Sequence, residues 1–180
     1  IHVGNRPGVY RIATNAGIVQ VAALPWLRRS ALLSREEMRN LSIDQVNEKL
    51  QEIITGKLFD IASEIDTGLP SILAAHIAIS NARAGSESSM LVGRDPLLLL
   101  SNVSRPVFDY VALGHIHKKQ VLHELPPVIY AGSLERFDFG DEGQEKGFFI
   151  VTIDCREGEK YTSYEFHPVN ARRFLTIRAD

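Results

Sequence analysis

The spacing of apolar residues predicts one long helix in the first half of the chain. Between Ser42 and Ile65, apolar residues recur at three- and four-residue steps and form a single stripe among polar positions. Its members are Val46, Leu50, Ile53, Ile54, Leu58, Ile61 and Ile65. The turn formers of segment 66–70 end this helix. A short helix is also predicted after Ser34, because Ser34 and Glu37 fit a capping box.

Strand patterns surround these helices. Segments 9–12 and 18–24 are rich in strand formers and flank Asn15-Ala16-Gly17, which predicts a hairpin. Nearly continuous apolar runs predict strands at 71–79, 108–113, 128–131 and 148–153, the first of them buried on both faces. Segment 80–89 is small and polar and predicts a mobile surface loop, whereas 91–104 fits either a helix or a strand. Strands that alternate with helices indicate an α/β layered sandwich.

Composition and charge fit one domain over residues 1–180. Hydrophobic residues make up 44% and charged residues 23% of the chain, as in ordinary water-soluble domains. The apolar runs fall far short of the roughly 20 residues that span a bilayer, so we expect no membrane partner. The single Cys155 is expected to be a buried, inert thiol in a reducing, cytoplasmic compartment. With a net charge of −2, nucleic acid could be contacted only through local basic clusters, namely Arg28-Arg29, Lys118-Lys119 and Arg172-Arg173.

Histidines carry the candidate chemistry. Residues two apart in extended backbone point the same way, so His115 and His117 of Gly114-His115-Ile116-His117 can face one pocket. Neutral imidazole binds Mn, Fe or Zn. From spacing alone, a surface pair without an ion explains the motif equally well. His76 lies in an apolar run, and that pattern by itself favours a hydrogen-bonded core histidine. His2, His123 and His167 lie in polar or proline-flanked segments and are expected to be solvated.

Three stretches together resemble a known family. They are Ala74-Ala75-His76, the segment from Asp109 to Lys118 and the segment from Tyr130 to Gly140. They are similar to SbcD, the exonuclease subunit of the SbcCD DNA-repair complex. That family is a bacterial relative of the meiotic-recombination nuclease and belongs to the calcineurin-like metallophosphoesterases. Segments 24–30 and 166–177 are also similar, so the likeness covers nearly the whole chain in order.

The resemblance implies a fold, a reaction and a ligand set. The fold would be part of a four-layer αββα sandwich, and the reaction would be hydrolysis of DNA phosphodiesters by an exonuclease and endonuclease in double-strand break repair and recombination. Two divalent ions are expected as cofactors, Mn first, with Mg, Fe or Zn as alternatives. His76 and His115 would bind one ion and His117 the other. The expected partners are DNA, the SMC-like ABC ATPase subunit SbcC and a possible second copy of the chain.

The family also uses an upstream Asp-X-His, a Gly-Asp and a Gly-Asn-His motif, and we expect none of these ligand motifs here. Gly4-Asn5-Arg6 has arginine in place of the histidine and is rejected. We therefore expect the chain to be the downstream portion of the nuclease domain, without the upstream motifs, the capping domain or the ATPase-binding segment. Three neutral imidazoles bring no negative charge to offset two divalent ions. The 180 residues alone are expected to be inactive, because the resemblance places the catalytic histidine upstream of Ile1.

Further residues have two explanations each. Ser133-Leu134-Glu135-Arg136 could orient DNA or ligands, as the family pattern implies, or form a capped turn. Trp26 could stack on a base while Arg28 and Arg29 contact phosphates, or it could pack in the core beside solvated arginines. The candidate DNA contacts are Arg28, Arg29, Lys118 and Arg136. Two other functions remain open: a phosphatase for small phosphoesters and a catalytically silent fragment that binds DNA or a partner.

Overall fold

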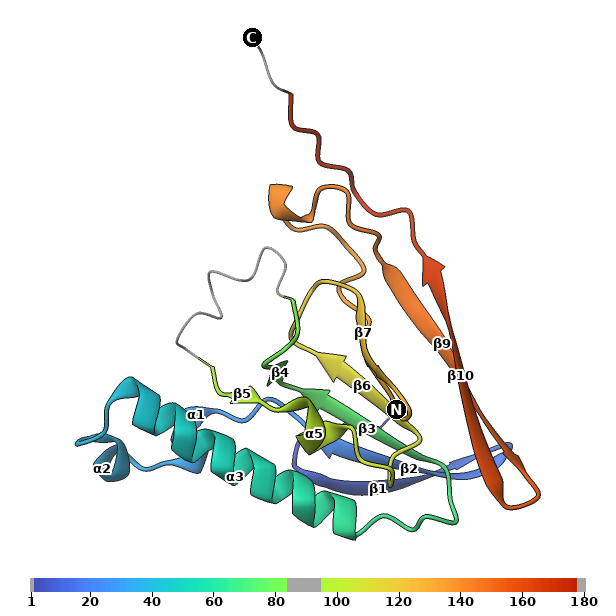
Figure 1. The fold of residues 1–180 in the computed structure, drawn as a ribbon, viewed down its shortest axis with the longest axis horizontal. Helices are drawn as coiled ribbons and strands as arrows, with labels where there is room; N and C mark the ends of the chain where they lie inside the picture. Colours follow the sequence, from blue (N-terminus) through green and yellow to red (C-terminus); the bar gives the residue numbers. More distant parts are fainter. Residues whose placement is uncertain (1, 84–94, 178–180) are drawn as a thin grey trace.

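The computed structural model of the protein describes residues 2–83 and 95–177. Ile1 lies outside the described residues, and the expectation of a catalytic histidine upstream of it stays a prediction. A mixed six-stranded sheet runs through the molecule in the order β1-β2-β3-β6-β8-β7 (Figure 1). Its strands are β1 (Gly8–Thr14), β2 (Gly17–Leu24), β3 (Ser71–His76), β6 (Tyr110–Gly114), β7 (Gln120–Glu124) and β8 (Pro127–Tyr130). The predicted α/β class is confirmed at this level.

The middle of the sheet is parallel. β2 pairs with β3, β3 with β6, and β6 with β8 in parallel, while β1 and β7 form antiparallel edges. The predicted hairpin is confirmed as β1 and β2, joined at Gly17, whose φ of 121° suits glycine. Parallel pairing places the carboxyl ends of β2, β3, β6 and β8 along one edge of the sheet, where α/β folds commonly place ligands.

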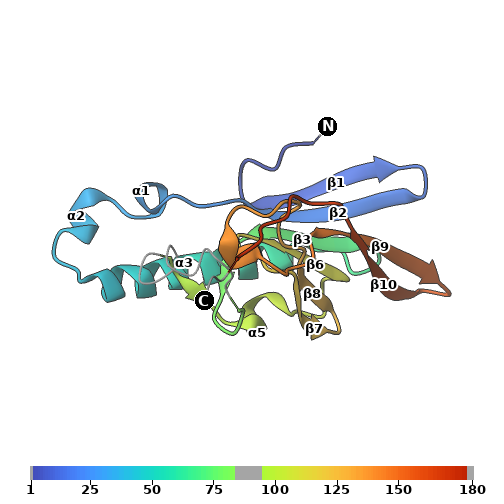
Figure 2. The same cartoon turned by 90° about the horizontal axis from the view of Figure 1, so that it is seen from above.

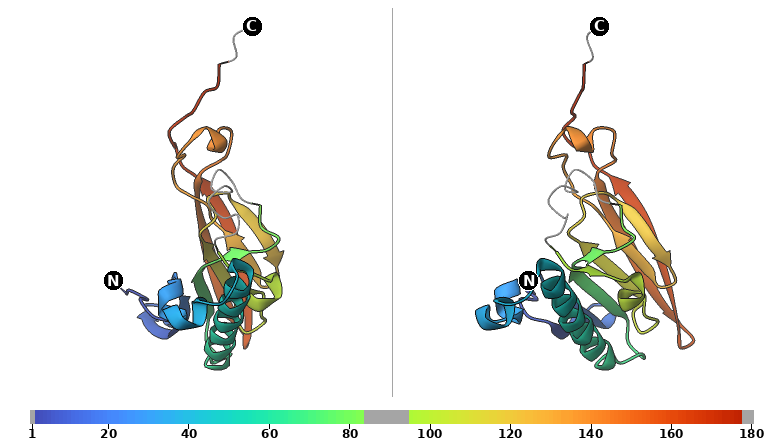
Figure 3. Two further views of the ribbon diagram at one scale, coloured as in Figure 1. Left: turned by 90° about the vertical axis from the view of Figure 1, so that its left-hand side faces the viewer. Right: turned by 60° about the vertical axis from the view of Figure 1, so that its left-hand side comes forward.

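One face of the sheet is covered by helix α3 (Ile43–Ser63), the long helix that the apolar stripe predicts (Figure 3). Ser42 caps it through a capping box with Gln45. Its buried residues Ile54, Leu58 and Ile61 join a core of sheet residues that includes Leu73 and Val111. The other helical segments are short: α1 (Arg29–Leu32), α2 (Arg35–Met38), which carries the predicted capping box of Ser34 and Glu37, and α5 (Leu100–Val103).

A two-stranded ribbon of β9 (Gly147–Arg156) and β10 (Glu159–Pro168) packs against the sheet and projects beyond it (Figure 2). β10 reaches the start of β6, where Lys160 Nζ lies 2.9 Å from Asp109 Oδ2 and Thr162 Oγ1 donates to the Asp109 carbonyl at 2.9 Å. The sequence predicts β9 but neither β7 nor β10. Cys155 lies on β9 and is exposed, so the expectation of a buried thiol is wrong. The ribbon leaves this end of β9 open to solvent.

The apolar run 71–79 contains two strands in different sheets. β3 ends at His76, and β4 (Ala78–Ile79) pairs instead with β5 (Leu97–Leu98). Tyr130 fixes this break, because its hydroxyl donates to the Ile77 carbonyl at 2.7 Å and accepts from the Ile79 amide at 3.2 Å. Burial alternates along β3, so the expectation that both of its faces are buried is wrong.

The two ambiguous loop segments are described only in part. Residues 80–83 form a turn, and the remainder of the predicted mobile loop lies outside the described residues. Within 95–104, β5 and α5 show that the segment contains both a short strand and a short helix. None of the helices described is long and apolar enough to span a membrane.

Candidate functional site at the carboxyl ends of the parallel strands

Candidate site residues follow four adjacent parallel strands. Trp26 lies two residues after the end of β2, and His76 is the last residue of β3. Gly114 ends β6 and pairs with His76 in the register, so His115 comes directly after that pair. Gly132 lies two residues beyond β8. Segments distant in sequence therefore meet at one edge of the sheet.

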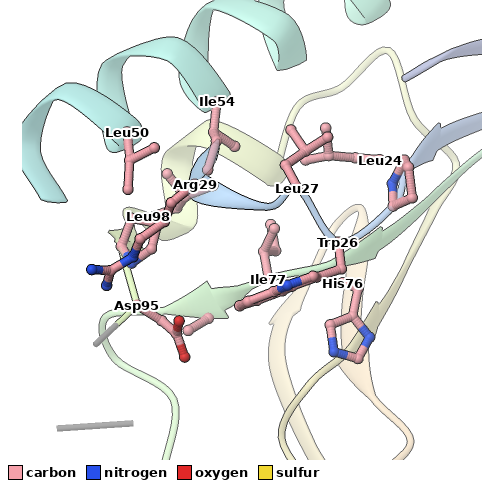
Figure 4. Close-up of a pocket in the computed structure, with 13 residues that line it drawn as sticks. Leu24, Trp26, Leu27, Arg29, Leu50, Ile54, His76, Ile77, Asp95 and Leu98 are labelled. Atoms are coloured by element: carbon pink, nitrogen blue, oxygen red, sulfur yellow. The ribbon is translucent and has the colours of Figure 1, made fainter. Parts of the chain in front are cut away.

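Two of the predicted ligands, His76 and His115, lie in contact. Their ring centroids are 5.2 Å apart, with the rings inclined at 73°. Trp26 stacks on His115 at 5.3 Å and meets His76 edge-on at 5.7 Å. Figure 4 shows the indole beside His76 at a small, mainly apolar pocket, with Asp95 on the far side. Trp26 is 47% exposed, so it is not the core residue of the second explanation.

The backbone at this contact is constrained. His115 has a φ of 102°, a region that residues with a side chain rarely adopt and that costs about 1 to 3 kcal/mol. A Cβ added at Gly114 would lie 3.0 Å from His76 Nδ1, so glycine lets the His76 imidazole lie directly over the end of β6. The turn that begins at Gly114 thus aims His115 back towards Trp26 and His76.

The His76 imidazole is held in its neutral form. Desolvation lowers its pKa from the usual 6.5, and His115 and His117 lower it further. His76 as a residue is exposed, yet its ring lies against Trp26 and His115, which remove water from it. Desolvation by these ring contacts acts directly on the ionisable group and therefore lowers its pKa. A pKa below 6.5 leaves the imidazole neutral at physiological pH, the form that binds metals.

His117 lies on the same edge, near the loop that follows β8. Its ring is 5.2 Å from that of Phe137, and its carbonyl accepts from the Ser133 amide at 3.1 Å. Ser133 Oγ donates to the Glu135 carbonyl at 2.7 Å, so the segment 133–136 forms a turn packed on the His117 backbone. Whether this turn orients DNA or a ligand stays a prediction.

Asp95 is a candidate site residue that sequence reasoning missed. Its Oδ2 lies 3.6 Å from His115 Nε2, with side chains 20% and 14% exposed. A carboxylate beside an imidazole can orient the ring and raise its basicity as a ligand. Asp95 lies within segment 91–104, whose secondary structure the sequence leaves ambiguous, and no spacing ties it to His115. Only the tertiary fold brings the two together.

The geometry fits two imidazoles that share one ion. An imidazole nitrogen about 2.1 Å from a metal places the ring centre about 3.2 Å from it, so two such rings in tetrahedral geometry lie about 5 Å apart. The 5.2 Å between His76 and His115 meets this requirement. Among the described residues, however, no group of three or more His, Cys, Asp or Glu side chains is arranged to hold a metal ion. A complete site needs donors beyond these.

One expectation about carboxylates needs correction. A Gly-Asp pair does occur, at Gly140-Asp141, downstream of the histidines. Asp141 is completely buried, and its Oδ1 lies 3.3 Å from Lys146 Nζ. It accepts the Phe137 amide through Oδ2 at 3.1 Å. Asp141 faces the interior of the loop and does not bridge metal ions.

The candidate DNA contacts differ in their surroundings. Arg28 is exposed, and Arg29 lines the pocket beside Trp26 while donating to Asn47 Oδ1 at 3.1 Å. Lys118 follows His117 and is half-buried. Arg136 donates to the carbonyls of Gln144, Ala171 and Arg172, which ties the loop to the C-terminal segment. Arg136 therefore has a structural role, and whether Arg28, Arg29 and Lys118 contact DNA stays a prediction.

The remaining histidines lie elsewhere. His2 is exposed, as expected. His123 is half-buried on β7 with Nδ1 3.0 Å from the Pro126 carbonyl, and His167 is half-buried on β10, stacked on Phe148 at 5.5 Å. Local contacts of the edge strand and the ribbon shield part of each ring, so these two histidines are only partly solvated.

Comparison of the chain with models of known protein families gives no match.

Proposed function

We propose that this chain is the downstream, histidine-bearing portion of a two-metal DNA nuclease of the SbcD type. The observation that carries the proposal is the contact of His76 and His115, 5.2 Å apart at the ends of adjacent parallel strands, with His117 two residues further on. The order of motifs in the sequence supports the same conclusion. The reaction class is hydrolysis of DNA phosphodiesters, by exonuclease and endonuclease action in break repair.

The residues have separate roles in this proposal. His76 and His115 would hold one divalent ion and His117 the other, with Mn expected and Mg, Fe or Zn as alternatives. Bound as a pair, such ions lower the pKa of water and neutralise charge on a phosphodiester. Asp95 orients His115, Trp26 packs against both His76 and His115, and Arg28 and Lys118 contact phosphates of the DNA. The bridging carboxylate, the asparagine ligand and the catalytic histidine would come from outside the 180 residues, upstream of Ile1.

An open part of the sheet supports a larger sandwich. Tyr10, Val21, Ala74 and Ala112 line a broad pocket that reaches His76, and all four are only half-buried. An apolar sheet face of this kind is normally covered by another layer. We propose that upstream elements cover it and complete a four-layer αββα domain. An SMC-like ATPase subunit and a second copy of the chain are the proposed partners, by resemblance alone.

One observation favours a second function. Among the described residues no group of three donor side chains forms a metal site, so the chain on its own could be a silent fragment that binds DNA or a partner without ions. The two functions differ in whether His76 and His115 bind a metal at all.

Metal binding can be measured through the single tryptophan. Trp26 lies within 6 Å, centroid to centroid, of both His76 and His115. A paramagnetic ion held by the two imidazoles quenches tryptophan emission at such distances. Co²⁺ is the better probe than Mn²⁺, because imidazole sites bind it more tightly. We expect saturable quenching by Co²⁺ that is weakened at least about tenfold in His76→Ala and His115→Ala.

His123→Ala is the matched control, because His123 lies on β7 away from Trp26. It should quench like the wild type. Equal quenching in all four proteins, or none in the wild type, would contradict the metal site and favour the silent fragment.

A further inference from the structure

A buried ion pair lies beneath His117. The side chains of Lys146 and Asp141 are 1% and 0% exposed, and Lys146 Nζ is 3.3 Å from Asp141 Oδ1. The contact is ionic and not a well-directed hydrogen bond, since Oδ1 has no hydrogen-bond partner. Burying two charges is costly, and an apolar pair of similar size often stabilises a fold as well or better. Stability therefore does not by itself explain the pair.

Lys146 contacts the backbone of His117, a candidate metal ligand. Its Nζ donates to the His117 carbonyl at 3.1 Å. The same carbonyl accepts from the Ser133 amide at 3.1 Å, and a Cβ at Gly132 would lie 2.6 Å from it. The position of the His117 carbonyl is thus fixed by two hydrogen bonds, from Lys146 and from the Ser133 amide, and by the close approach of Gly132.

Asp141 acts on the other side of His117. Its Oδ2 accepts from the Phe137 amide at 3.1 Å. The Phe137 ring lies 5.2 Å from the His117 ring. The two members of the pair therefore hold, respectively, the backbone of His117 and the residue that packs against its imidazole.

We propose that Lys146 and Asp141 are positioning residues that fix the direction of the His117 imidazole towards His76 and His115. This inference rests on the proposed function, since it assumes that His117 is a metal ligand. In this proposal the loop 132–146, which follows β8, sets the direction of the His117 imidazole. Neither residue touches the metal or the substrate.

The chain offers a matched control. Lys160 Nζ lies 2.9 Å from Asp109 Oδ2 and 3.2 Å from the Leu69 carbonyl, so it too joins a carboxylate and a backbone carbonyl. Its side chain is 19% exposed and lies at the amino end of β6, away from the histidines. Lys160→Met removes a comparable pair without reaching His117.

The test compares Lys146→Met with Lys160→Met in the 180-residue chain. The His117 ring is followed by ¹⁵N NMR without metal, and Co²⁺ affinity at His117 is measured from the paramagnetic broadening of its ring signals, since Trp26 lies against the other two histidines. We expect Lys146→Met to weaken Co²⁺ binding about 10- to 100-fold and to shift or broaden the His117 ring signals. Lys160→Met should leave both unchanged, although each variant lowers the unfolding midpoint.

A double variant separates positioning from stability. Asp141→Asn combined with Lys146→Met leaves no unpaired buried charge, so it should recover stability but not Co²⁺ affinity. It is also the form to measure if Lys146→Met does not fold. Wild-type affinity together with unchanged His117 signals in Lys146→Met or in the double variant would overturn the positioning role and leave the metal site standing. A wild type that binds no Co²⁺ would overturn the proposed function and, with it, this inference.

Discussion

The two ends of the central sheet use polar residues differently. At the amino end, Asp109 Oδ2 accepts from the Ser71 amide at 2.8 Å and from Lys160 at 2.9 Å, which joins the starts of β3 and β6 to β10. The Asp109 carboxylate there is satisfied by the Ser71 amide, the Ser71 hydroxyl and Lys160. At the carboxyl end, His76 is exposed, and His115 adopts a φ of 102°.

The polar groups at the amino end stabilise the fold, whereas the histidines at the carboxyl end are positioned by it. Satisfied buried polar groups stabilise a structure. Backbone strain such as that of His115 costs stability, and such strain is concentrated at functional sites. The amino end should therefore respond to mutation mainly in stability, and the carboxyl end mainly in ligand binding and activity.

The largest effect is expected at the carboxyl end. In a longer protein that supplies the missing ligands, His115→Ala and His117→Ala should each abolish DNA cleavage with Mn²⁺, by a factor of about 10³ or more, because a metal centre contributes several kcal/mol of transition-state stabilisation. The metal-free variants should unfold at nearly the wild-type temperature. Retained cleavage, or a large stability loss without loss of cleavage, would show that these histidines are structural.

The amino end should give the opposite result. Asp109→Ala removes the acceptor of the Ser71 amide and the partner of Lys160, so we expect a loss of about 2 to 3 kcal/mol in the free energy of unfolding. Co²⁺ quenching of Trp26 should not change. Urea titration measures the loss. Asp154→Ala at the exposed tip of the ribbon is the control and should have no measurable effect.

Tyr130 should affect both stability and metal binding. Its buried hydroxyl contacts the Ile77 carbonyl and the Ile79 amide, directly after His76. Burial raises its pKa, so the hydroxyl stays protonated and able to donate at any physiological pH. Tyr130→Phe should cost about 1 to 2 kcal/mol, because a buried carbonyl and amide lose their partner. It should also weaken Co²⁺ binding, because the break after β3 helps to position His76. A loss of stability with unchanged Co²⁺ affinity would show that this break does not position His76.

The smallest effects come from two glycines. Gly56 lies in the middle of α3 with no atom near its missing Cβ, so Gly56→Ala should stabilise the protein by about 0.5 to 1 kcal/mol. In Gly114→Ala the new Cβ would lie 3.0 Å from His76 Nδ1. That imidazole must move by a few tenths of an ångström, and Co²⁺ affinity should fall several-fold. Equal affinity in both variants would mean that the position of His76 is not critical.

Sequence reasoning predicted local features better than distant contacts. The stripe of α3 and the capping boxes at Ser34 and Ser42 depend on neighbouring residues, and the structure has them. β10 was missed because its alternating residues are mostly polar, and its pairing with β9 supplies the order that its own pattern lacks. The break between β3 and β4 depends on Tyr130, more than 50 residues away.

The candidate site also combines features that local sequence predicts with contacts that only the fold creates. The spacing of His115 and His117 is a local signal, and the resemblance adds His76. The contacts of Asp95 with His115 and of Lys146 with the His117 carbonyl cross between segments that no pattern links. A buried lysine in a polar loop looks like a solvated charge in the sequence, because only the fold shows what surrounds it.

The most direct test is a crystal structure of the chain grown with Mn²⁺ and measured for anomalous scattering. The central claim predicts an anomalous peak within about 2.0 to 2.3 Å of one nitrogen of His76 and one of His115. His117 should point into the same space. A peak elsewhere, or imidazoles of His76 and His115 that turn away from each other with no peak between them, would contradict the claim that these strand ends form a metal site.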